Sequence, residues 1–123
     1  SDSASYFDRK IREDVLLWKH RYKIKIDENA LDIQTVEGYI GEAYGIASQE
    51  IFDLIAELGR AEGLLLDPVY TGKAFYGMIS ELAKGEAGRL PGAKQVVFVH
   101  TGGLFGLFPQ QHGFAFNEGH AGF

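Results

Sequence analysis

Two short apolar runs, each followed by a polar turn that contains glycine, set the strongest limit on how this chain can fold. Residues 64–66 lead into the turn of residues 67–74, and residues 96–99 lead into residues 100–103. Runs this short, flanked by glycine or proline, are typical of buried strands. Polar residues directly after such strands lie at the edge of a sheet where α/β proteins bind ligands. We therefore expect the two turns to contribute to a ligand site.

Size and charge narrow the class of protein. A chain of 123 residues with 46% hydrophobic content can bury the core of one small domain. The net charge of -5 argues against a nucleic-acid partner, because phosphate binding needs clustered cations. No apolar run has membrane-spanning length and the N-terminus lacks signal-peptide features, so we expect a cytoplasmic protein without a membrane partner.

Metal and disulfide chemistry find little support in the sequence. The absence of cysteine excludes disulfides and thiolate metal sites. His112 and His120 are possible metal ligands, but no carboxylate or thiolate framework surrounds them in the sequence. The expectation is a protein without a metal site.

Three segments have apolar residues at helical spacing. We predict helices over residues 4–19, from Ser48 to either Gly59 or Gly63, and from Gly72 to about residue 84. The apolar positions are Phe7, Ile11, Val15 and Trp18 in the first, Ile51, Leu54, Ile55 and Leu58 in the second, and Phe75, Met78, Ile79 and Leu82 in the third. Each helix is expected to lay this face on a core.

Strands are predicted between these helices. The candidates are residues 22–26 at an edge, residues 32–37, and the apolar runs 64–66 and 96–99. Because strands and helices alternate with short connections, the fold class expected is α/β, with a mostly parallel sheet flanked by helices. Uncovered sheet edges then predict association with another chain or with a second copy.

The residues near the two turns offer several kinds of chemistry. The glycine-rich loop of residues 38–45 can approach a ligand by its backbone, and Tyr44 there either faces a ligand or packs as a wall residue. The backbone N–H groups of residues 71–73 begin a helix and favour an anion or a ring acceptor. Lys73 is expected to be a solvated charge.

These residues carry a family resemblance. Gly38-Tyr39-Ile40-Gly41 with Tyr44-Gly45, then Asp67-Pro68-Val69-Tyr70-Thr71-Gly72-Lys73-Ala74, then His100-Thr101-Gly102-Gly103 stand in one order and spacing. In this respect the chain resembles the C-terminal part of the D-cysteine desulfhydrase and aminocyclopropane-carboxylate deaminase family. These are pyridoxal-phosphate enzymes of the tryptophan-synthase-β-like fold, also called fold type II. The resemblance covers residues 1–108, as part of the large cofactor-binding domain, and leaves residues 109–123 as a tail of uncertain placement.

The resemblance implies roles for five residues. Tyr44 and Tyr70 match the active-site tyrosines, whose phenols face the substrate. Thr71 and Thr101 match positions where the deaminases have glutamate and leucine and the desulfhydrases have hydroxyl residues. Thr101, followed by Thr71, is the expected partner of the cofactor ring nitrogen, because a hydroxyl supplies a neutral hydrogen bond there. Gly102 is expected to lie against the cofactor.

The resemblance also implies what this chain lacks. The lysine that holds the cofactor covalently matches a position upstream of Ser1, and Lys73 is not that lysine. We therefore expect a fragment or subunit, inactive alone, that binds pyridoxal phosphate only with the upstream N-terminal portion and forms a homo-oligomer. The expected reaction is β-elimination of D-cysteine, a small D-amino acid, to pyruvate, ammonia and sulfide. Aminocyclopropane-carboxylate deamination and a non-catalytic structural or binding remnant remain alternatives.

Overall fold

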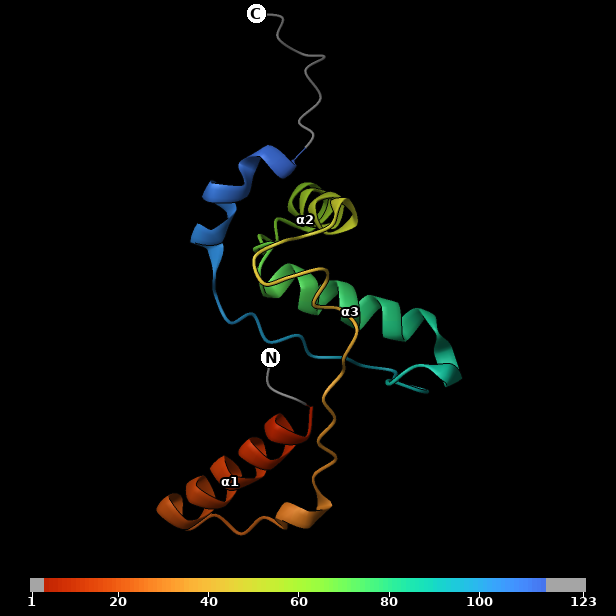
Figure 1. Ribbon diagram of the computed structural model, residues 1–123. Helices are drawn as coiled ribbons and strands as arrows, with labels where there is room; N and C mark the ends of the chain where they lie inside the picture. Colours follow the sequence, from red (N-terminus) through yellow and green to blue (C-terminus); the bar gives the residue numbers. More distant parts are fainter. Residues whose placement is uncertain (1–3, 115–123) are drawn as a thin grey trace, which may run out of the picture. The chain divides into compact units, whose positions relative to one another are not determined.

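The computed structural model describes residues 4–114 and is helical throughout this range (Figure 1). Three α-helices alternate with three 3-10 helices along the chain. Their bounds are α1 Ala4–Tyr22, η1 Glu28–Ala30, α2 Gln49–Glu62, α3 Thr71–Ala83, η2 Gly85–Ala87 and η3 Leu104–Gly113. All three predicted α-helices are confirmed, and the first extends three residues further than expected.

The chain divides into two compact units, Ser1–Glu37 and Gly38–Phe123. In the first unit, the hydroxyl of Thr35 donates a hydrogen bond to Asp8 of α1 at 2.7 Å. The predicted apolar stripe of α1 is not buried in the described residues: the exposed fraction is 44% for Phe7 and 47% for Trp18. The prediction that this stripe packs on a core is therefore not met in this part of the chain.

In the second unit, α2 packs against α3 (Figure 1). Buried Ile51 and Ile55 of α2 form the core together with Leu66, which is fully buried. Around them pack Ala47, Leu58, Leu64, Phe75, Tyr76, Phe98, Leu107 and Phe114. Ser48 is the N-cap of α2, and the helix ends at Gly63, whose φ of 67° is the left-handed value that glycine adopts without strain.

The buried face of α3 differs from the predicted one. Lys73, Gly77 and Glu81 are buried, at i, i+4 and i+8, whereas the predicted apolar residues of this helix are half-buried. An added Cβ at Gly77 would lie 3.1 Å from the ring of Tyr39, so this glycine lets a tyrosine pack directly on the helix backbone. Small and hydrogen-bonded polar residues, rather than the apolar stripe, therefore form the most buried side of α3.

No β-strand occurs in residues 4–114, so the predicted strands at 22–26, 32–37, 64–66 and 96–99 are absent there. Residues 22–26 instead complete α1 and turn at Lys23, which has a φ of 53°. A strand requires hydrogen bonds to a neighbouring strand, and no described segment supplies them to residues 64–66 or 96–99. Val97 and Val99 are accordingly 88% and 72% exposed, and only Phe98 packs inward, on Phe75.

The last described residues fold back on α2. The ring of Phe114 packs edge-on against Phe52, with the centroids 5.0 Å apart, and an added Cβ at Gly113 would overlap Phe52. Residues 115–123, with His120 and most of the predicted tail, lie outside the described residues. Within residues 4–114 there is no metal-binding cluster of histidine and carboxylate residues, and no helix long and apolar enough to span a membrane.

Candidate active site

Asp67 is the centre of the turn that precedes α3. Its side chain is 1% exposed and accepts hydrogen bonds from the backbone N–H groups of Val69, Tyr70 and Thr71 at 2.8–2.9 Å. The Thr71 hydroxyl donates a further bond at 2.6 Å and accepts one from the Asp67 N–H at 2.8 Å. Burial alone would raise the pKa of Asp67, but these bonds outweigh it and hold that pKa below its ordinary value.

The local sequence explains why the chain turns here. Pro68 disfavours helical geometry at Asp67 and has no N–H to leave unsatisfied, while Asp67 caps the new helix from outside. Gly72 follows because an added Cβ there would lie 2.7 Å from the Asp67 carbonyl oxygen and 2.8 Å from Ile55. The predicted anion site at the start of α3 is therefore wrong: the N–H groups of Thr71 and Gly72 already bind Asp67.

The structure brings Tyr44 and Tyr70 together. Their hydroxyl groups share a hydrogen bond, and their rings meet edge-on with centroids 5.8 Å apart. The side chains are 76% and 57% exposed, so both phenols face outward from the described residues. The bond to Tyr44 is the main cause of a raised pKa of Tyr70, which keeps this phenol protonated at neutral pH.

Lys73 anchors the loop that carries Tyr44. Its ammonium group donates hydrogen bonds to the carbonyl oxygens of Ile40 at 2.5 Å and Ala43 at 3.3 Å. The residue is 8% exposed, and burial lowers its pKa. The sequence-based expectation of a solvated lysine is therefore wrong, and the residue is occupied by backbone carbonyls.

A second anchor joins the same loop to the other end of α3. The Tyr39 hydroxyl donates to Glu81, which also accepts from the Lys84 ammonium at 2.6 Å and from the Arg89 N–H at 2.8 Å. These bonds lower the pKa of Glu81 to about 2. Sequence reasoning missed both anchors, although the spacing of Lys73, Gly77 and Glu81 places them on one helix face.

The second predicted turn lies against the first. Gly103 has a φ of 89°, and an added Cβ there would lie 2.7 Å from Asp67 Oδ1. His100 Nε2 donates to the Leu65 carbonyl oxygen at 2.8 Å, and its Nδ1 accepts from the Gly102 N–H at 3.0 Å, which defines the tautomer. Thr101 between them is exposed, and its hydroxyl makes no hydrogen bond within the described residues.

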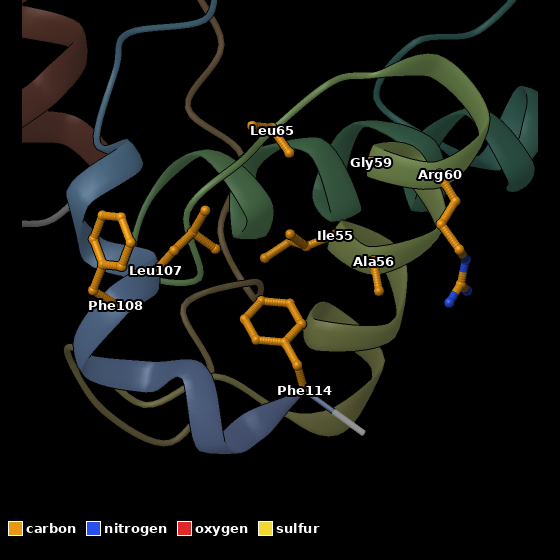
Figure 2. Close-up of a pocket in the computed structure, with 8 residues that line it drawn as sticks. All are labelled: Ile55, Ala56, Gly59, Arg60, Leu65, Leu107, Phe108 and Phe114. Atoms are coloured by element: carbon orange, nitrogen blue, oxygen red, sulfur yellow. The ribbon is translucent and has the colours of Figure 1, made fainter. Parts of the chain in front are cut away.

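An apolar cavity lies apart from all five predicted site residues. It has a volume of about 360 Å³ and lies between α2 and η3 (Figure 2). Its lining residues are Ile55, Ala56, Gly59, Arg60, Leu65, Leu107, Phe108 and Phe114. Figure 2 shows the guanidinium of Arg60 directed away from the other lining side chains, so no polar group enters the cavity to orient a ligand.

The matches to known proteins decide the family. The model of the pyridoxal-phosphate dependent enzymes matches residues 18–102. The chain belongs to this family. Among the relatives of this family member is a Thermotoga maritima protein provisionally named 1-aminocyclopropane-1-carboxylate deaminase, 37% identical over 108 residues. That match covers 88% of this chain and 31% of the relative.

Two further relatives point to the same branch of the pyridoxal-phosphate enzymes. An Arabidopsis thaliana protein named as a bifunctional mitochondrial D-cysteine desulfhydrase/1-aminocyclopropane-1-carboxylate deaminase is 35% identical, over 65% of this chain and 20% of its own. The 1-aminocyclopropane-1-carboxylate deaminase of Allorhizobium ampelinum is 41% identical, over 72% of this chain and 25% of its own. The chain thus spans less than a third of each relative. No solved structure matches the chain.

The described residues fit the ring of pyridoxal phosphate at one position. The exposed Thr101 hydroxyl, without a partner in the described residues, can donate to a pyridine nitrogen. The Thr71 hydroxyl is 3% exposed and already both donates to and accepts from Asp67. The N–H of Gly102 is bound by His100. Of the three predicted cofactor-binding residues, Thr101 is the one with an available side-chain donor.

Proposed function

We propose that this chain is part of a pyridoxal-phosphate-dependent D-cysteine desulfhydrase-like enzyme. In the net reaction, D-cysteine and water give pyruvate, ammonia and hydrogen sulfide. The observation that carries the proposal is the hydrogen-bonded pair of Tyr44 and Tyr70, which a loop and a helix bring together from 26 residues apart. These are the two tyrosines that the family resemblance assigns to the substrate.

The chemistry of the paired phenols suits this reaction. Bound pyridoxal phosphate supplies an electron sink for the electrons left at the substrate Cα. One phenol of the pair donates to the other, and the remaining hydroxyl proton is available to a group in front of the pair. Because the pKa of Tyr70 is raised, the pair stays protonated at neutral pH and can donate a proton to a departing sulfur atom.

The threonines favour D-cysteine over aminocyclopropane carboxylate. The neutral hydroxyl of Thr101 leaves the pyridine nitrogen unprotonated and the electron sink shallow. Sulfide is a good leaving group and needs less stabilisation at Cα than the opening of a cyclopropane ring. Aminocyclopropane-carboxylate deamination remains the second candidate, because the names of all three relatives above include that activity.

The rest of the enzyme belongs to the proposal as well. We infer that residues 64–67 and 95–99 pair with strands of an upstream N-terminal portion and complete a mostly parallel sheet, because Val97 and Val99 lie exposed without it. The upstream portion also supplies the covalent attachment of the cofactor. A homo-oligomer and a cytoplasmic location complete this picture.

Product analysis tests the proposal. The complete enzyme containing this sequence is loaded with pyridoxal phosphate and incubated separately with D-cysteine, L-cysteine and aminocyclopropane carboxylate. We expect equal amounts of sulfide and pyruvate from D-cysteine. Formation of 2-oxobutanoate from aminocyclopropane carboxylate, without sulfide from D-cysteine, would establish the second candidate. No product from any substrate would leave a non-catalytic module.

A further inference from the structure

Lys73 is an ammonium group buried among carbonyl oxygens rather than carboxylates. It donates to Ile40 and Ala43, and within residues 4–114 no carboxylate lies within 4.0 Å of it. Burying a cation without a counter-ion costs free energy that backbone carbonyls offset only in part. A residue placed at such a cost, next to a candidate active site, has a role that a neutral side chain would not fill.

The loop of residues 38–45 needs external anchors. Gly38, Gly41 and Gly45 have φ values of 98°, 80° and 77°, so the loop backbone is built around positions that constrain the chain least. Its large side chains give little support, since Ile40 is 60% exposed and Tyr44 is 76% exposed. Within the loop, one backbone hydrogen bond closes its end, from the Ile46 N–H to the Ala43 carbonyl oxygen at 3.2 Å.

One turn of α3 holds both partners of this loop. Tyr70 is the N-cap of α3, and its carbonyl oxygen accepts from the Ala74 N–H at 2.9 Å, so residues 70–74 form one rigid turn. Tyr70 binds the Tyr44 hydroxyl from this turn, and Lys73 binds the carbonyl of Ala43, the residue directly before Tyr44.

We propose that Lys73 is a positioning residue that fixes the Ile40 and Ala43 carbonyls, so that the Tyr44 hydroxyl meets that of Tyr70. The consequence for turnover rests on the proposed function. The consequence for the hydrogen bond between the two phenols does not. Lys73 itself touches neither hydroxyl in this account and acts through the loop backbone.

The titration of Tyr70 measures this role without turnover. Tyrosine is labelled with 13C, and the midpoint is followed by NMR in the unsubstituted protein, Lys73→Met, Lys73→Arg and the control Lys10→Met. Removal of a nearby cation by itself raises a tyrosine pKa, whereas separation from Tyr44 lowers that of Tyr70. We expect the midpoint to fall toward its ordinary value of about 10 in Lys73→Met, to recover in Lys73→Arg, and to stay unchanged in Lys10→Met. An unchanged or raised midpoint in folded Lys73→Met overturns the proposal.

Two further measurements cover the remaining outcomes. If Lys73→Met does not fold, scalar coupling across the hydrogen bonds from Lys73 15Nζ to the Ile40 and Ala43 carbonyl carbons is measured in the unsubstituted protein, and its absence overturns the proposal. In the complete loaded enzyme, Lys73→Met is expected to lower kcat about tenfold with Tyr44 present and to add little in Tyr44→Phe. Equal losses in both backgrounds contradict positioning through Tyr44. An enzyme without turnover refutes the proposed function, and the titration still decides the role of Lys73.

Discussion

The carboxylate of Asp67 and the hydroxyl of Thr71 bind each other reciprocally: Thr71 donates to Oδ1 at 2.6 Å and accepts from the Asp67 N–H at 2.8 Å. Both residues are at least 97% buried, so neither group can exchange its partner for water. The pair fixes the start of α3 and hence the place of Tyr70. Thr71 therefore supports the candidate site from beneath rather than from within.

Thr71→Val is expected to destabilise the fold by about 1–3 kcal/mol, because it leaves the buried Asp67 N–H without an acceptor and removes one donor from the carboxylate. Thr71→Ser keeps the hydroxyl and is the matched control, with a smaller loss. Urea denaturation followed by circular dichroism measures both. Equal stability of Thr71→Val and the unsubstituted protein would contradict the role given to this hydroxyl.

Gly72→Ala and Gly59→Ala are expected to have opposite effects. An added Cβ at Gly72 collides with the Asp67 carbonyl at 2.7 Å and should cost about 1–3 kcal/mol of stability. At Gly59, within α2, the nearest atom is 3.5 Å away, so alanine should stabilise the helix by about 0.5–1 kcal/mol. Thermal denaturation of the two variants compares them directly, and a loss at position 59 equal to that at 72 would count against this packing.

The cluster around Glu81 is expected to make stability depend on pH. The pKa of Glu81 is lowered from 4.5 to about 2 by bonds from Lys84, Tyr39 and the Arg89 N–H. The stabilisation is fully present above about pH 5 and is lost as pH falls toward 2, because the unfolded chain takes up the proton first. The difference in melting temperature between the unsubstituted protein and Glu81→Gln should therefore shrink over this range. The exposed Glu86→Gln is the control, and a difference that is constant with pH would exclude this linkage.

Tyr44→Phe and Tyr70→Phe are expected to lower kcat for sulfide release by about 10²–10⁴-fold in the complete enzyme, the range for loss of a positioned acid or base. Tyr22→Phe, in the other unit, is the control for loss of an exposed hydroxyl. Sulfide release and the visible absorbance of bound cofactor are measured together. Loss of kcat with the absorbance retained supports proton transfer, whereas turnover within twofold of the unsubstituted enzyme removes both phenols from the mechanism.

The helices were predictable because their signals are local. Ser48, the spacing of Ile51 and Ile55, and Gly63 define α2 in sequence and in structure alike. The strands were not, because an extended run becomes a strand only beside a partner. Val97 and Val99 have the composition of a strand and no partner in the described residues.

The candidate site was predictable in its residues but not in its supports. Tyr44 and Tyr70 emerged from the family resemblance, and the structure brings them into contact. The burial of Lys73 depends on carbonyl groups 30 and 33 residues away, for which no periodicity or motif gives a sign. The neighbouring Thr71 carries a hydroxyl that suggested a ligand contact, and only the fold shows that Asp67 already occupies it.

The first turn of α3 uses four consecutive residues in four directions: Tyr70 toward a phenol, Thr71 toward Asp67, Gly72 toward the core and Lys73 toward the loop. Successive residues of an α-helix are rotated by about 100°. The rotational phase of this helix is thus set by four contacts at once. Inserting or deleting one residue between Asp67 and Lys73 would turn all four contacts away together, whereas a substitution disturbs them one at a time.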